Sequence, residues 1–288
     1  MRFRYECPTR WADMDVQKHV NNVVYADYLQ EARVAFFREA HVAGRREPTE
    51  RPAMVVSKSR LVYREPLEHR EAGVAVELWL TRLGAASFAL DYEVFTEGPD
   101  GRRVHASATT EHAAFDLATN KLRRISPEED AALRPWLDEP EEPAAPLPRL
   151  GEGPRTEAGH YPVQVRWSDL DPYRHVNNVK FLEYFQEARL RLHSRLWHEL
   201  PPPRSFSIVV AQADLEYVRP MFLRPEPYDV WSWVSRVGER SYTIEAEISD
   251  GERAVARSRV VVVCVDPATG RATHPDPVYL DALRAAAG

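Results

Sequence analysis

One string of residues occurs twice in this chain and constrains its fold more than any other feature. The stretch from Arg10 to Arg33 reads RWADMDVQKHVNNVVYADYLQEAR, and the stretch from Arg166 to Arg189 reads RWSDLDPYRHVNNVKFLEYFQEAR. Fourteen of these 24 positions are identical. Because half of 288 residues is an ordinary domain size, the repeat indicates one domain that has been duplicated and fused.

The region between the two halves has the composition of a linker. Residues 137–160 combine prolines, acidic residues, glycines and small residues without a hydrophobic period. We therefore predict an N-terminal domain over residues 1–136, a semi-extended linker over residues 137–160, and a C-terminal domain over residues 161–288.

Each half is predicted to contain one long helix and several strands. Apolar residues with the i, i+3, i+4, i+7 spacing of a buried helix face are Tyr25, Tyr28, Leu29, Ala32 and Phe36, matched by Phe181, Tyr184, Phe185, Ala188 and Leu192. Segments rich in strand-forming residues cover 53–64, 73–83, 86–97 and 103–116, then 205–218, 228–237, 240–249 and 253–266. Short helices should follow the capping pairs Ser126-Pro127 and Asp276-Pro277. This order predicts an α+β fold in which an antiparallel sheet wraps around one central helix.

Composition argues against several classes of function. The 38 basic and 44 acidic residues give a net charge of −6, which offers no sequence-wide attraction to nucleic acid. Cys7 and Cys264 have neither disulfide nor metal-binding spacing. The longest apolar run, Val260 to Val265, is too short to cross a membrane, and the first ten residues lack the apolar segment of a signal peptide. We expect a cytoplasmic protein without nucleic acid or membrane partners.

The repeated string places polar residues between the first strand and the long helix. Asn21 or Asn22, like Asn177 or Asn178, is suited to cap that helix, because an Asn side chain accepts a hydrogen bond from a free first-turn amide. The same free amides and the positive end of the helix dipole suit an oxygen that develops negative charge. A carbonyl held there would be polarised for attack.

A carboxylate in the same loop could then attack that carbonyl or direct a water molecule. Asp15 and Asp171 lie four residues before His19 and His175. The alternative is structural, with Asp13 or Asp15 tying the loop down through backbone amides. Two loops with the same spacing are less easily explained by turn chemistry alone.

The histidines have two interpretations as well. His19 and His175 could carry a proton or orient the Asp, or they could be neutral side chains that pack against the loop. We expect no metal site, because no third ligand recurs at a suitable spacing. Trp11 and Trp167 could line a substrate pocket, although core packing is the commoner fate of such aromatic residues.

The pattern Trp-x-Asp-(Met/Leu)-Asp-x-x-x-His-Val-Asn-Asn-Val, ahead of a long helix, resembles the hotdog-fold thioesterases. The branch that is most similar contains the 4-hydroxybenzoyl-CoA thioesterase-like and short-chain acyl-CoA thioesterases. The resemblance covers residues 1–136 and 161–288, with its strong motifs in the first 35 residues of each half. It implies two tandem hotdog domains that pair side by side as a pseudo-dimer, with acyl sites at their interface and with possible further homo-oligomers.

The resemblance also implies roles for individual residues. Asp15 and Asp171 match the loop Asp that is nucleophile or general base in that branch. The backbone amides of Asn22 and Asn178 match the group that polarises the thioester carbonyl, which makes Asn21 and Asn177 possible substrate-binding neighbours.

Two positions depart from the family pattern. Glycine usually precedes His-Val-Asn-Asn, whereas Lys18 and Arg174 stand here, so the loop could bend differently or place a cation near the substrate. The acyl-ACP thioesterases have Asn two residues after the Asp, whereas this chain has Gln17 and Tyr173, which makes an acyl-ACP substrate less expected.

We therefore predict an acyl-CoA thioesterase that releases a free acid and coenzyme A without a metal or redox cofactor; coenzyme A enters only as part of the substrate. One alternative is a hotdog enoyl-CoA hydratase, although those enzymes space Asp and His by five residues rather than four. The other is a non-catalytic acyl-CoA-binding hotdog protein in which the Asp is structural.

Overall fold

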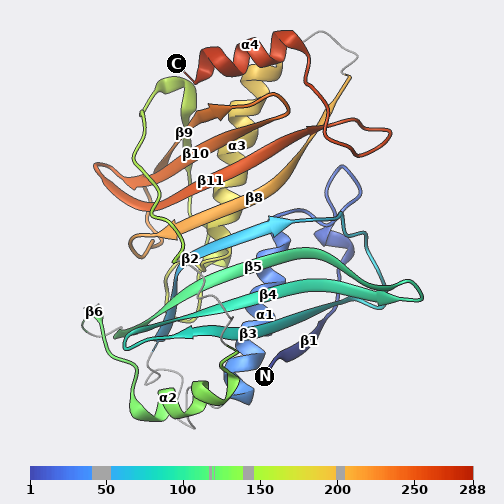
Figure 1. Ribbon diagram of the computed structural model, residues 1–288. Coiled ribbons are helices and arrows are strands. Elements are labelled where there is room, and N and C mark those ends of the chain that lie inside the picture. The colour runs from blue at the N-terminus through green and yellow to red at the C-terminus, as the bar shows by residue number, and fades with distance from the viewer. Residues whose placement is uncertain (41–52, 117–118, 120, 139–145, 199–204, 288) are drawn as a thin grey trace. The chain divides into compact units, whose positions relative to one another are not determined.

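A computed structural model describes residues 1–40, 53–116, 119, 121–138, 146–198 and 205–287 (Figure 1). The chain divides into two compact units, Met1–Pro148 and Arg149–Gly288. Residues 139–145 of the expected linker lie outside the described residues, and residues 146–148 and 149–160 fall in the first and second unit respectively.

The first unit contains an antiparallel sheet with the strand order β1-β3-β4-β5-β2. The long helix α1 follows β1 and a short 3-10 turn in the chain, and α2 follows the last strands. The bounds are β1 Phe3–Cys7, α1 Val24–Glu39, β2 Ala53–Tyr63, β3 Val74–Leu83, β4 Ser87–Gly98, β5 Gly101–Asp116, β6 Lys121–Leu122 and α2 Pro127–Leu133.

The second unit repeats this arrangement. Its antiparallel sheet has the order β8-β11-β10-β9-β7, and α3 occupies the position of α1 in the chain order. The bounds are β7 His160–Val163, α3 Lys180–His198, β8 Ser207–Tyr217, β9 Tyr228–Val237, β10 Ser241–Asp250, β11 Arg253–Val265 and α4 Pro277–Ala286.

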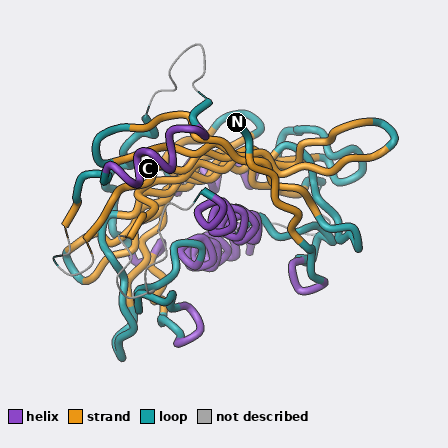
Figure 2. Tube along the Cα trace, turned by 90° about the horizontal axis from the view of Figure 1, so that it is seen from below, coloured by secondary structure: helices purple, strands orange, loops and turns teal. Residues whose placement is uncertain are grey.

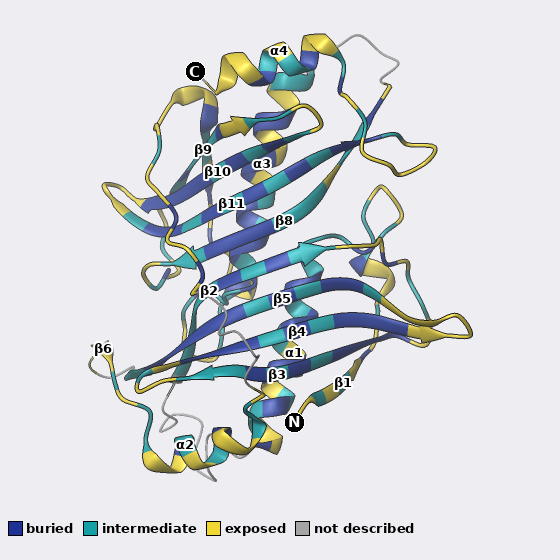
Figure 3. Ribbon diagram, viewed as in Figure 1, coloured by how far each residue is buried: buried dark blue, intermediate teal, exposed yellow. Residues whose placement is uncertain are grey.

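The core of each unit lies between its sheet and its long helix. All of the apolar helix positions expected from the spacing are buried, from Tyr25 to Phe36 in α1 and from Phe181 to Leu192 in α3. Burial alternates along strands such as β9, because successive side chains point to opposite faces of a sheet (Figure 3). The long helices run along the concave side of the strands (Figure 2). The expected α+β hotdog architecture is confirmed in both units.

The short C-terminal helices begin where the capping pairs predicted. Ser126 accepts a hydrogen bond from the Glu129 amide and completes a capping box, and Asp276 accepts one from the Val278 amide. None of the helices in the described part of the chain combines the length and the apolarity that crossing a bilayer requires.

Candidate active site

A tight loop joins the first strand of each unit to its long helix, and backbone hydrogen bonds fix its shape. In the first unit the Asp15 amide donates to the His19 carbonyl over 2.9 Å, and the Asn21 amide donates to the Asp13 carbonyl over 2.8 Å. The second unit repeats both bonds at 2.8 Å, from Asp171 to His175 and from Asn177 to Asp169. The loop is therefore a small closed hairpin that is the same in both units.

The residue before each histidine adopts a left-handed backbone conformation. Lys18 has φ 65° and Arg174 has φ 63°, and they are the positive-φ residues other than glycine among the described residues. Glycine is the usual residue for this conformation, which costs a residue with a Cβ about 1–2 kcal/mol. Each loop thus makes a glycine-type bend without glycine and leaves one cationic side chain exposed on it, Lys18 in the first unit and Arg174 in the second.

A buried carboxylate anchors each loop to its helix. Asp13 is 1% exposed and accepts hydrogen bonds from the Arg10 amide over 2.7 Å and from the Tyr28 hydroxyl of α1 over 2.7 Å. Asp169 is also buried and accepts the corresponding bonds from Arg166 and Tyr184. With both of these carboxylates committed inside the fold, their role is structural.

The second carboxylate of each loop is only partly buried, and its two oxygens differ. Asp15 Oδ1 accepts a hydrogen bond from the Gln17 amide over 2.8 Å. Asp171 Oδ1 accepts from the Tyr173 amide over 2.8 Å and from the His175 amide over 3.1 Å. No described residue donates to Oδ2 of either carboxylate. Turn formation therefore uses one oxygen and leaves the other open for chemistry.

The environment of Asp171 also affects its protonation. Burial raises the pKa of this carboxyl group above its usual value, and the backbone amides of His175 and Tyr173 and the charge of His175 only partly offset that effect. A carboxylate with a raised pKa is a stronger base, which suits a group that must take a proton from water.

The peptide that precedes the helix directs an N–H outward. The Asn21 carbonyl accepts a hydrogen bond from the Val24 amide over 3.0 Å and so points along the helix. Because a trans peptide is planar, the Asn22 N–H on the other side of that bond points away from the helix. No described residue accepts a hydrogen bond from it. In the second unit the Lys180 amide donates to the Asn177 carbonyl over 2.9 Å, which fixes the direction of the Asn178 N–H in the same way.

The prediction that Asn caps the helix is wrong in its detail. The residue at the cap position of α1 is Val23, which has no side-chain cap, and α1 starts at Val24. Asn21 Oδ1 instead accepts a 3.3 Å hydrogen bond from the Val23 amide. The Asn side chain thus shapes the entry to the helix rather than satisfying an amide of its first turn.

Two tyrosines that the sequence did not identify as part of the site hold this peptide segment. Tyr63 on β2 donates its hydroxyl hydrogen to the Asn22 carbonyl over 2.7 Å, and Tyr217 on β8 donates to the Asn178 carbonyl over 3.1 Å. Each ring also packs edge-on, at 5.3 Å between centroids, against the first aromatic residue of its helix. Their equivalent places in the two halves, Tyr63 before Arg64-Glu65-Pro66 and Tyr217 before Val218-Arg219-Pro220, were the available signal.

The remaining candidates lie around the loops. His19 and His175 are partly exposed, and the His175 ring stands edge-on to Phe222 with centroids 4.9 Å apart. Trp11 and Trp167 are 80% and 79% exposed, so the expectation that they pack in the core is wrong. Both present an exposed ring beside a loop, where they could contact a ligand.

Other reactive groups are less suited to nucleophilic chemistry. Cys7 and Cys264 are buried, and burial raises the pKa of each thiol to about 11. Within the described residues, no group of three or more His, Cys, Asp and Glu side chains is arranged to hold a metal ion.

Comparisons with known proteins agree with this picture. The sequence model of the family described as the thioesterase-like superfamily matches residues 9–137 and 165–283. The long-chain acyl-CoA thioesterase FadM of Escherichia coli (strain K12) is 29% identical in an alignment of length 121 that covers 38% of this chain and 85% of FadM.

Two solved structures share the fold over most of this chain. A putative oleoyl thioesterase from Lactobacillus plantarum matches with a TM-score of 0.73 and 13% identity, covering 91% of this chain and 96% of the other. The 12:0-ACP thioesterase from Umbellularia californica matches with a TM-score of 0.72 and 18% identity, covering 91% and 94%. At these identities the likeness concerns the fold alone.

Proposed function

Because the chain belongs to the thioesterase-like superfamily and is a thioester hydrolase with two hotdog domains, we propose that its substrates are acyl-CoA thioesters, cleaved to a free acid and coenzyme A. The observation that carries this proposal is the pairing, in both loops, of a carboxylate with one open oxygen and a backbone N–H that points out of a helix N-terminus.

The two groups have complementary tasks in the proposed mechanism. The open oxygen of Asp15 or Asp171 either attacks the thioester carbon or takes a proton from the water that attacks it. As the carbonyl oxygen becomes negative, the outward N–H of Asn22 or Asn178 donates a hydrogen bond to it. In the general-base route the C–S bond then breaks, the protonated carboxylate returns its proton to the sulfur so that coenzyme A leaves as the thiol, and the oxygen of water ends in the acid. In the nucleophilic route breakage of the C–S bond leaves an Asp–acyl anhydride; water attacks its acyl carbon, the bond to the Asp oxygen breaks, the free acid is released with the Asp regenerated, and a proton from that water ends on the thiol.

The neighbouring residues support these steps. We propose that His19 and His175 help to move the proton or to orient the carboxylate, which is consistent with the effect of His175 on the pKa of Asp171. Tyr63 and Tyr217 position the peptide after each outward N–H through its carbonyl. Lys18 and Arg174 are candidates to contact a phosphate of coenzyme A. The mechanism involves no metal or redox cofactor, because neither an electron transfer nor a Lewis acid is needed once an oxyanion donor is in place.

The preference for coenzyme A over a carrier protein rests on the matched sequences. FadM, the curated relative at 29% identity, is described as acting on long-chain acyl-CoA. The similarity to the 12:0-ACP enzyme concerns the fold alone. The family resemblance implies an Asn two residues after the Asp in acyl-ACP enzymes, where this chain has Gln17 and Tyr173.

A substrate panel with thiol detection tests the proposal. We expect thiol release from acyl-CoA substrates of several chain lengths, and slower release from the same acyl groups on an acyl carrier protein. Faster release from the carrier protein would reassign the substrate class. Loss of enoyl absorbance without thiol release would point to a hydratase, and binding without any turnover would point to a non-catalytic protein.

A further inference from the structure

Each catalytic loop lies beside the connection between two long strands of its own unit, β2 and β3 in the first unit and β8 and β9 in the second. These connections are equal in length and comprise residues 64–73 and 218–227. The Val20 amide donates to the Leu67 carbonyl over 2.7 Å, and the Val176 amide donates to the Met221 carbonyl over 2.8 Å. The two connections therefore meet their catalytic loops in the same register and can be compared residue by residue.

The residues around the two loops differ in chemistry. Three positions that are polar in the first unit are aromatic or aliphatic in the second: Tyr173 replaces Gln17, Phe222 replaces Glu68, and Leu223 replaces His69. Positions that are apolar in both units are Trp11 with Trp167 and Val16 with Pro172. We call the three exchanged positions the rim of each site. The first rim is thus polar and the second rim is apolar.

Ring contacts place both rims beside the loops. The Phe222 ring packs edge-on against His175 with centroids 4.9 Å apart, and the His175 amide donates to Oδ1 of Asp171 over 3.1 Å. In the first unit the His69 ring stands edge-on to the exposed Trp11 at 6.0 Å. A substrate held at Asp171 therefore lies next to the second rim.

The exposure of the rim residues decides what they can bind. Phe222 is 47% exposed and Leu223 is 42% exposed, and Tyr173 is exposed as well. Covering such side chains with hydrocarbon is favourable roughly in proportion to the area removed from water. At the position of Phe222 the first unit exposes the carboxylate of Glu68, which an alkyl chain would have to desolvate at a cost. The second rim therefore favours contact with hydrocarbon, and the first rim disfavours it.

The acyl group is the part of the substrate that such a difference can select. The coenzyme is identical in every acyl-CoA, whereas the acyl group varies. Both loops keep a cation at the same position, Lys18 and Arg174, so a phosphate of the coenzyme would meet the same sign of charge in either unit. The exchange from a polar to an apolar rim therefore concerns the acyl group.

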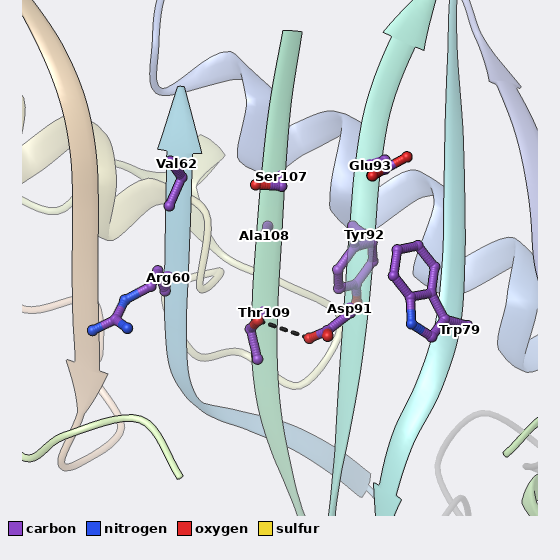
Figure 4. Close-up of a pocket in the computed structure, with 9 residues that line it drawn as sticks. All are labelled: Arg60, Val62, Trp79, Asp91, Tyr92, Glu93, Ser107, Ala108 and Thr109. Atoms are coloured by element: carbon purple, nitrogen blue, oxygen red, sulfur yellow. Dashed lines mark hydrogen bonds between the residues drawn. The ribbon is translucent and has the colours of Figure 1, made fainter. Parts of the chain in front are cut away.

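A hollow on the sheet of the first unit is unsuited to an alkyl chain (Figure 4). Its volume is about 190 Å³, and charged side chains line it, among them Arg60, Asp91 and Glu93. None of the residues that line it belongs to a catalytic loop or to the first rim. An acyl chain in this hollow would have to desolvate charged groups far from any reacting atom.

We propose that the two sites divide acyl groups between them: the second site takes long-chain acyl groups, with Phe222 and Leu223 as specificity-determining residues, and the first site takes short ones. This inference rests on the proposed hydrolysis of acyl-CoA. The rim contacts the chain rather than the reacting carbonyl, so it stabilises the bound substrate and the transition state alike. Its effect belongs in KM rather than in kcat.

Thiol release from butanoyl-CoA and dodecanoyl-CoA by two single-site variants of the full chain tests the proposal. Asp15→Asn leaves the second site, and Asp171→Asn leaves the first. At the second site the KM for dodecanoyl-CoA should be about tenfold or more below that for butanoyl-CoA, because each methylene group that is buried changes binding about fourfold. At the first site the two KM values should differ by less than about threefold. The kcat of each site should vary little with chain length.

Exchange of the rim residues tests their assignment. Added to the variant that keeps the second site, Phe222→Glu should reduce the preference for dodecanoyl-CoA about fivefold or more, and Leu223→His should act in the same direction. Added to the variant that keeps the first site, Glu68→Phe should create such a preference. Val278→Glu is the matched control, because Val278 is an exposed apolar residue of α4 beside Tyr279, whose ring packs on Trp197 at the far end of α3. It should leave the preference unchanged.

The same dependence on chain length at both sites, or the reverse preference, would overturn the proposal. So would a preference that survives both Phe222→Glu and Leu223→His. If Phe222→Glu raised KM equally for the two substrates, the rim would contact the coenzyme, and the proposal would again be overturned. A single silent site would contradict the division of acyl groups while turnover at the other site upholds the proposed function. A parent that releases thiol from neither substrate would instead contradict the proposed function itself.

Discussion

Each loop carboxylate uses its two oxygens differently, and this allows a turn residue to serve as a catalyst as well. The sequence left two interpretations of Asp15 and Asp171 open, an Asx turn or a catalytic base. The geometry is compatible with both, because the turn occupies only Oδ1. Spacing along the chain could not reveal this, since it depends on which oxygen faces the backbone.

The pKa of Asp171 leads to a prediction for pH dependence. In an Asp15→Asn variant, activity should depend on ionised Asp171, whose pKa is raised by burial. The acidic limb of kcat/KM should therefore lie above the ordinary Asp value of about 3.9. The effect on folding stability runs in the other direction. Because the folded-state pKa is raised, protonated Asp171 stabilises the fold at pH values below the unfolded-state pKa, and this stabilisation is lost as the pH rises through the folded-state pKa. A limb at or below the ordinary value would contradict the raised pKa.

A second prediction concerns Lys18 and Arg174, whose backbone is left-handed. Lys18→Gly and Arg174→Gly should each raise the free energy of unfolding by about 0.5–1 kcal/mol, because relief of backbone strain exceeds the added entropy of the unfolded chain. Denaturant unfolding measures this. Gln17→Gly, in the same loop but without a positive φ, should be destabilising. If the cations also bind a coenzyme A phosphate, the two glycine variants will show a raised KM.

At the scale of elements, the link between loop and helix depends on Asp13 and Asp169. Asp13→Ala should lower the free energy of unfolding by about 2–4 kcal/mol, because it leaves the buried Tyr28 hydroxyl and the Arg10 amide without their acceptor. Asp130→Ala, which removes an exposed carboxylate paired only at the surface, should cost less than about 1 kcal/mol. Equal losses in the two variants would show that Asp13 is no anchor.

The sequence predicts the helices and strands more completely than the contacts between them. Strands and long helices lie within a few residues of the expected ranges, because alternating or helical spacing of apolar residues decides burial locally. The prediction that an Asn caps the helix is wrong for α1, because Val23 occupies the cap position and the helix begins at Val24. Tyr63 and Tyr217 act through contacts distant in sequence, which no local pattern specifies.

At the scale of the whole molecule, duplication provides two copies of one arrangement. Both loops have the same backbone–backbone hydrogen bonds, a left-handed residue at the same position and the same outward N–H. If the sites work independently, Asp15→Asn and Asp171→Asn should each retain about half of the parent kcat. If one of the two single variants loses nearly all activity, the site changed in that variant accounts for nearly all of the hydrolysis. Pairing of the two domains within the chain and a cytoplasmic location stay predictions.

The rate of thiol release from acyl-CoA by the double variant Asp15→Asn, Asp171→Asn tests the proposed mechanism more directly than any single variant. Asn keeps an Oδ1 that accepts the same backbone amides, so thermal stability should stay close to that of the parent. Loss of both bases should lower kcat by about 10²–10⁴-fold. A folded double variant that hydrolyses acyl-CoA at nearly the parent rate would contradict the assignment of both carboxylates.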